Sequence, residues 1–143
     1  MWQNLISKIS SNQDEKEING NQSIAVILVR AAKTDNSYTD SEKKLIDEIL
    51  IKQMKFEPED AIKLRVRAEF LETAINDNIQ LTRIIKKEIP YEDRDVLIQQ
   101  LWRIILDDDM RTPEENKFMR VLSYLLGVSD IKSAQARSKA FDH

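Results

Sequence analysis

The chain contains no cysteine, and its single histidine, His143, is the last residue. The absence of cysteine excludes disulfides, thiolate metal sites and cysteine nucleophiles. Because chain ends are the least ordered part of a protein, we expect no Ser–His–Asp triad, no histidine zinc site and no Glu-x-x-His di-iron site. A metal site in this protein is therefore expected to use oxygen ligands, which suit hard cations.

Glycine, proline and long apolar runs are also scarce. The chain has two Gly and three Pro, and its longest apolar run, 24–29, is far shorter than the roughly 18 residues of a membrane span. The N-terminus lacks the long apolar region of a signal peptide, so we expect a cytoplasmic protein. With 41% hydrophobic and 33% charged residues among 143, the composition is typical of a single helical domain.

The charges are nearly balanced. The 22 basic and 25 acidic residues give a net charge of −3, and the two signs are interspersed along the sequence. This pattern indicates solvated helix surfaces and shows no basic face for a phosphate backbone. We therefore expect a protein partner and no nucleic acid.

Apolar residues recur with helical spacing along most of the chain, which predicts an all-α fold. We expect helices from Ser23 to about Lys33, from Thr39 to about Lys55, from Pro58 to a break at Asn76–Asn78, from that break to Pro90, from Pro90 to about Leu106, from Thr112 to Leu126, and from Ser129 towards His143. Gly127 suits a left-handed C-cap, and Pro58 suits a first helical turn. The fold class is a compact bundle of about seven to eight helices, with the nearly all-apolar helix after Ser23 at its centre.

The first 22 residues form a separate region. Trp2, Leu5, Ile6 and Ile9 have helical spacing and predict a short amphipathic helix, followed by a polar linker up to Gln22. We interpret this helix as docked on the bundle. The alternative is a membrane-surface or partner anchor, which is disfavoured because Lys8 is its only basic residue. The expected organisation is 1–22 as segment and linker, and 23–143 as the helical domain.

One acidic pattern occurs twice, each time between two expected helices. Asp35, Thr39 and Glu42 in the first copy match Asp108, Thr112 and Glu115 in the second, and the apolar register extends outward on both sides. An internal repeat is evidence about architecture. We therefore expect the bundle to be built on two pseudo-repeated helix–acidic turn–helix units.

The Thr-x-x-Glu part of each copy is a capping box, in which threonine and glutamate each bind the other's backbone N–H. Asp35 and Asp108 need a further reason, because a carboxylate at the end of a helix opposes its dipole. Either the aspartate closes the turn with its own side chain, or it converges with the glutamate on a cation. The spacing is not that of an EF-hand loop, whose glutamate stands at position twelve and which has a central glycine. The candidate metal ligands are Asp35, Glu42, Asp108, Glu115 and Asp109.

The paired motif resembles the TerB-like tellurite-resistance family, whose turns read Asp-Gly-x-apolar-[Thr/Ser]-x-x-Glu. A similar domain accompanies some DnaJ-type co-chaperones. The resemblance covers roughly 24–139, most strongly from Arg30 to Glu42, Tyr91 to Arg94 and Arg103 to Val128. It implies a bundle with the acidic residues of both turns on one surface, binding of divalent cations such as calcium, and a role in stress responses to tellurite or other toxic anions.

The sequence departs from the family motif at two positions of each copy. Asn36 and Asp109 replace the usual glycine; both residue types tolerate the turn, and Asp109 adds a possible ligand. The usual apolar residue is Tyr38 in the first copy but Arg111 in the second, where a positive charge opposes cation binding.

The favoured hypothesis is a non-enzymatic protein whose acidic turns bind a divalent cation, Ca²⁺ or Mg²⁺, or a basic partner surface, without an organic cofactor. The alternative is a purely structural interaction module in which the turns only cap helices and an apolar face near Trp2 or Trp102 docks a partner. We expect Trp102 to be buried. A two-metal hydrolase is disfavoured because no basic clamp accompanies the acids. The run 93–95 is interpreted as first-turn acids with a surface ion pair.

Overall fold

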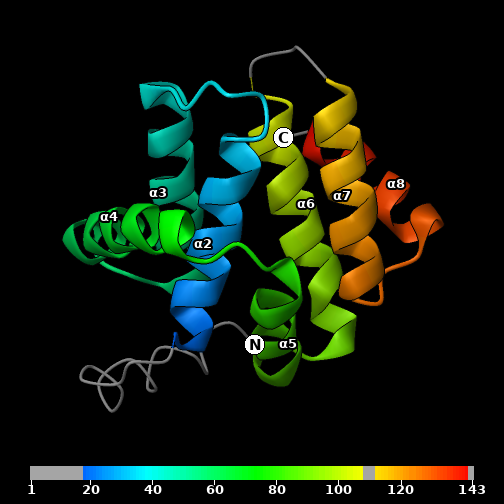
Figure 1. The fold of residues 1–143 in the computed structure, drawn as a ribbon, viewed down its shortest axis with the longest axis horizontal. Helices are drawn as coiled ribbons and strands as arrows, with labels where there is room; N and C mark the ends of the chain where they lie inside the picture. Colours follow the sequence, from blue (N-terminus) through cyan, green and yellow to red (C-terminus); the bar gives the residue numbers. More distant parts are fainter. Residues whose placement is uncertain (1–17, 108–111, 142–143) are drawn as a thin grey trace.

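Seven α-helices and one short 3-10 helix make up the part of the chain that the structure describes, residues 18–107 and 112–141 of a computed structural model (Figure 1). This part contains no strand, which confirms the all-α prediction. The helices are α2 (Gly20–Ala32), α3 (Asp40–Met54), α4 (Pro58–Ala74), α5 (Asn78–Glu88), η2 (Tyr91–Asp93), α6 (Arg94–Ile105), α7 (Pro113–Leu125) and α8 (Asp130–Phe141).

Helix α2 is the centre of the fold. Its run from Ile24 to Val29 is wholly inaccessible to solvent, and the helix contacts α3, α4, α5 and α6. A helix that is apolar on every side must be surrounded by others, so the predicted central position is confirmed. Figure 1 shows α4 crossing α2 between its two ends, while α8 lies against α6.

The start of α2 corrects one expectation. Ser23 does not cap this helix; the cap is Asn19, which forms a capping box with Gln22, and Ser23 lies buried within the helix. Asparagine accepts the free N–H groups as well as serine does, and Gln22 stands three residues further on, where the capping box requires it. The expected linker therefore does not reach Gln22. The predicted amphipathic segment, residues 2–9, lies outside the described residues.

Helices start and end at the residue types that favour these positions. Pro58 occupies the first turn of α4, as predicted. Gly127 has φ +75 and ends α7, with N–H groups of Gly127 and Val128 bonding back to Tyr124 and Ser123 in a Schellman motif. The Ser129 hydroxyl accepts the Lys132 N–H at the start of α8.

The run 93–95 after Pro90 contains the predicted first-turn acids, but the hydrogen bonds of Arg94 within the described residues go to backbone carbonyls and not to a surface ion pair. The α-helix starts at Arg94, after the 3-10 turn, and its guanidinium donates to the carbonyl oxygens of Lys86, Ile89 and Leu126 at 3.1–3.2 Å. These carbonyls lie at the C-terminal ends of α5 and α7, where backbone acceptors lack intrahelical partners. Arg94 therefore joins two helix ends.

Trp102 on α6 is buried, as predicted, with 7% of its surface exposed. Its indole N–H donates to the Ser133 hydroxyl of α8 at 3.2 Å. The hydrogen bond satisfies the one polar atom of a side chain that otherwise packs in the core.

Candidate cation site at the acidic turns

The first acidic turn leaves α2 after Ala32 and reaches α3 at Asp40. The Asp35 carboxylate accepts the Ser37 N–H at 2.9 Å, and Asn36 has φ +63. Asparagine therefore takes the left-handed conformation in which the family motif places glycine, as expected. The turn closure considered for Asp35 is therefore present, and its convergence with Glu42 on a cation stays a prediction.

Both predicted capping boxes are present. The Thr39 hydroxyl accepts the Glu42 N–H at 3.1 Å, and Glu42 Oε1 accepts the Thr39 N–H at 2.9 Å. In the second turn, the corresponding distances for Thr112 and Glu115 are 3.1 and 2.8 Å. The start of α3 and the start of α7 are thus fixed by the same reciprocal pair of hydrogen bonds.

The glutamates of these boxes are buried, which sequence reasoning did not predict. Glu42 and Glu115 expose only 4% and 2% of their surface. A buried carboxylate is costly unless N–H groups or positive charge stabilise it. Here the backbone N–H groups and the positive end of the helix dipole supply part of that stabilisation, so both carboxylates are held in fixed positions.

The start of α3, which follows the first acidic turn, lies close to Asp107, from which the second turn begins. The Ser41 hydroxyl, in the first turn of α3, donates to Asp107 Oδ2 at 3.0 Å, just after the end of α6. Figure 1 shows the ends of α2 and α6 and the starts of α3 and α7 at the same end of the bundle. Asp107 is not among the candidate ligands from the sequence, because its contact with a residue so distant in the chain leaves no local signal. The candidates Asp108 and Asp109, with Arg111, lie outside the described residues.

Arg103 of α6 interacts electrostatically with Asp107 at this junction. Burial lowers the pKa of the Arg103 guanidinium, and the negative charges of Glu48 and Asp107 oppose that shift. The side chain also donates to Gln100 Oε1 at 2.9 Å. The positive charge of Arg103 thus partly offsets the negative charges of Asp107 and Glu48.

A network ties the first turn to α4. The Tyr38 hydroxyl donates to Glu69 Oε2 at 2.5 Å, and Arg65 bridges Glu69 and Asp47 of α3 at 2.9 and 2.6 Å. Burial, followed by the hydrogen bond to Glu69, raises the pKa of the Tyr38 phenol far above its usual range. Sequence reasoning missed this network because it joins α3, α4 and the turn.

The donor set of the turns consists of carboxylates and hydroxyls, which suits a hard cation and not a soft one. Among the described residues, however, no three or more Asp, Glu or His side chains are grouped closely enough to hold a metal ion. Since Asp108 and Asp109 fall outside that part of the chain, the five-residue site stays a prediction.

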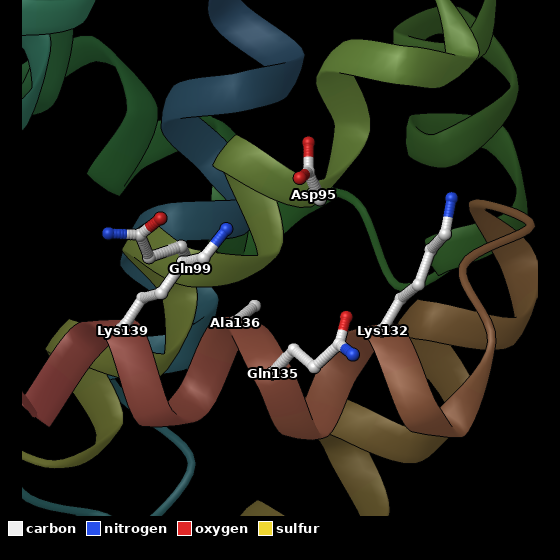
Figure 2. A pocket seen from close by; sticks show the side chains of 6 residues that line it. All are labelled: Asp95, Gln99, Lys132, Gln135, Ala136 and Lys139. Carbon is white, nitrogen blue, oxygen red and sulfur yellow. The ribbon is translucent and has the colours of Figure 1, made fainter.

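Two surface pockets lie away from the turns. One, of about 70 Å³, separates Asp95 and Gln99 of α6 from Lys132, Gln135, Ala136 and Lys139 of α8 (Figure 2). It is far smaller than the roughly 300 Å³ at which organic ligand sites begin. The other, about 320 Å³ and wide open, lies between α6, α7 and α8 beside Trp102 and Arg137. Neither pocket includes a residue of an acidic turn.

The fold and the turns define an all-α protein in which two capped acidic turns lie at one end of a helical bundle. The chain matches the family model described as tellurite resistance protein TerB over residues 21–138, and it belongs to this family. Comparisons with curated proteins and with solved structures gave no match. In the part of the chain described by the structure, no helix combines the length and apolar character needed to cross a bilayer.

Proposed function

We propose that this TerB-family protein is a non-enzymatic cytoplasmic protein that binds a divalent cation between its two acidic turns. Cation occupancy then tunes docking to a protein partner in a stress response. The observation that carries the proposal is the hydrogen bond from Ser41 to Asp107, because it brings the start of α3 close to the residue from which the second turn begins. Two turns this close can place their carboxylates around one ion or two neighbouring ions.

Each acidic residue has a distinct role in this proposal. Asp35 and Asp108 supply direct ligand oxygens, and Asp109 is a further donor. Glu42 and Glu115 accept their threonine N–H through Oε1, and in the proposal each presents its other carboxylate oxygen to the ion. Their burial holds both carboxylates in fixed positions next to the turns.

The ion class follows from the oxygen donors. Ca²⁺ accepts six to eight oxygens in flexible geometry, whereas Mg²⁺ requires a tighter octahedron and keeps several waters. The irregular turns therefore favour Ca²⁺ over Mg²⁺. A basic patch on a partner protein is the other occupant with matching charge.

A thermal melt of chelator-stripped protein tests the proposal, with Ca²⁺, Mg²⁺, Mn²⁺ and Zn²⁺ added at constant ionic strength. An ion at ~100 times its dissociation constant adds about 2.7 kcal/mol to the free energy of unfolding. We expect a saturable rise in Tm for one ion, and its loss in Asp35→Asn/Asp108→Asn.

The matched control is Asp60→Asn/Asp130→Asn. It makes the same change in net charge at exposed first-turn aspartates of α4 and α8. This variant should keep the full response to the ion. An equal response in the Asp35→Asn/Asp108→Asn variant and the control would refute the proposed site.

A second candidate function, a purely structural interaction module, is favoured by the hydrogen bonds within the turns. Asp35 closes its own turn, and Glu42 and Glu115 complete capping boxes, so these acids have structural roles without an ion. A flat response to all four ions would favour this function.

A further inference from the structure

Helix α4 is apolar on two sides. Its inner side buries Ala61, Leu64 and Ala68 against the bundle. Its outer side carries Ile62, Val66 and Phe70, which are 44%, 52% and 63% exposed. These three residues, which we call the α4 stripe, stand four residues apart and therefore lie in one row along the helix. A row of three large apolar side chains in water is a feature that the core does not explain.

We propose that residues 2–9 of the same chain cover the α4 stripe. Trp2, Leu5, Ile6 and Ile9 have the spacing of one apolar helix face. Residues 2–9 as a helix are about 11 Å long, and the stripe from Ile62 to Phe70 is about 12 Å long. The two apolar rows therefore match in length.

The connecting chain is long enough for this contact. Residues 10–17 can span up to about 27 Å when extended. Helix α2 is about 20 Å long and α4 packs against it between its ends (Figure 1), so less than this length separates Asn19 from the contact. Passing to the outer side of α4 adds about one helix diameter, 10 Å.

The size of the stripe argues against a second copy of the chain as its occupant. The three side chains expose on the order of 300 Å² of apolar surface, whereas a stable interface buries about 800 Å² on each partner. A segment of the same chain needs less contact area, because a short tether gives it an effective concentration in the millimolar range. The covering segment therefore competes with any partner protein that binds the stripe.

Tryptophan fluorescence of the full chain tests the proposal. The chain has two tryptophans and Trp102 is buried, so subtracting the emission of a Trp2→Phe variant from that of the wild type isolates Trp2. We expect a blue-shifted Trp2 emission and a several-fold lower acrylamide quenching constant than that of a peptide of residues 1–17. Val66→Asp should abolish both effects.

Ile131→Asp is the matched control, because Ile131 is an apolar residue of α8 that is 73% exposed. It should leave the Trp2 signal unchanged. The proposal would be overturned if acrylamide quenched Trp2 as strongly as in the free peptide, or if Val66→Asp and Ile131→Asp had equal effects. It would also be overturned if Trp2 were protected only after anionic phosphatidylglycerol vesicles were added.

A spin label separates the same chain from a second copy. Since the chain has no cysteine, Ser7→Cys provides a single labelling site. We expect the nitroxide to broaden backbone amides of α4 near Val66 in the labelled, ¹⁵N-enriched molecule. Equal broadening in a mixture of spin-labelled ¹⁴N protein and unlabelled ¹⁵N protein would assign the contact to a second copy and contradict the proposal.

Discussion

The two acidic turns share a capping box but differ in what surrounds them. The first turn is tied to α4 through Tyr38, whose hydroxyl binds Glu69. The second has Arg111 at the position equivalent to Tyr38, so it has no phenol for this hydrogen bond. The repeated motif therefore predicts the capping box that starts each following helix. It does not predict the side-chain contacts that connect a turn to the rest of the bundle.

The arginines that precede the turns differ in the same way. Arg30 of α2 donates to the Glu72 carboxylate at 3.1 Å, to Asn78 Oδ1 at 2.6 Å and to the carbonyl oxygens of Glu72 and Ile75. Arg103, at the same register of α6, donates to Gln100 within its own helix and lies near the acids of the second turn. Arg30 therefore stabilises the connection between α4 and α5, whereas Arg103 offsets part of the negative charge of Asp107.

The largest expected effect on stability distinguishes Arg30 from Arg103. Arg30→Ala leaves the mostly buried Glu72 with Lys33 as its only described ion-pair partner and removes hydrogen bonds at the end of α4. We expect a loss of about 3 kcal/mol in the free energy of unfolding, because hydrogen bonds from a charged donor contribute about 1.5–3 kcal/mol and the acceptors at the end of α4 lose theirs. Arg103→Ala should cost less than about 1 kcal/mol. Urea denaturation measures both, and equal losses would show that the two arginines have the same role.

The capping boxes should instead behave alike. Thr39→Ala and Thr112→Ala each remove one cap acceptor, and each should cost about 1 kcal/mol. The double variant should cost about 2 kcal/mol, unless contact between the turns couples the sites. Thr73→Ala is a suitable control, because Thr73 is exposed near the end of α4 and caps no helix start. A difference of more than about twofold between the two single variants would contradict equivalent caps.

A further difference between the turns concerns the hydrogen bond of Tyr38 to Glu69 in the first turn. Tyr38→Phe removes the hydrogen bond to Glu69 and should cost about 1 kcal/mol near neutral pH. The pKa of Tyr38 is raised in the folded protein, so its contribution is complete below the unfolded value of about 10 and falls as pH rises above it. Urea denaturation across this range should show the wild type losing its advantage over Tyr38→Phe at high pH. An advantage that stays constant above pH 10 would contradict the raised pKa.

The sequence predicted the features that depend on neighbouring residues. The capping boxes, the left-handed Gly127 and the central α2 follow from spacing and residue type within one or two turns of helix. The burial of Trp102 follows from the apolar stripe of its own helix.

Features that join distant parts of the chain were not predictable from spacing. The contact between Ser41 and Asp107 and the network from Tyr38 to Arg65 depend on how α3, α4 and α6 pack. The start of α2 was misplaced for a different reason: both Asn19 and Ser23 are good caps, and only packing shows that Ser23 is buried. The turn-closing hydrogen bond of Asp35 was one of two local alternatives and is present, while convergence of Asp35 and Glu42 on a cation stays a prediction.

Equilibrium dialysis of the full chain against calcium tests the central claim most directly. The wild type, Asp35→Asn/Asp108→Asn and Asp60→Asn/Asp130→Asn are compared at constant ionic strength. We predict saturable binding by the wild type and by the Asp60→Asn/Asp130→Asn control, and no saturable binding by the Asp35→Asn/Asp108→Asn variant. Absence of saturable binding in the wild type, or equal binding by all three proteins, would contradict a cation site at the acidic turns.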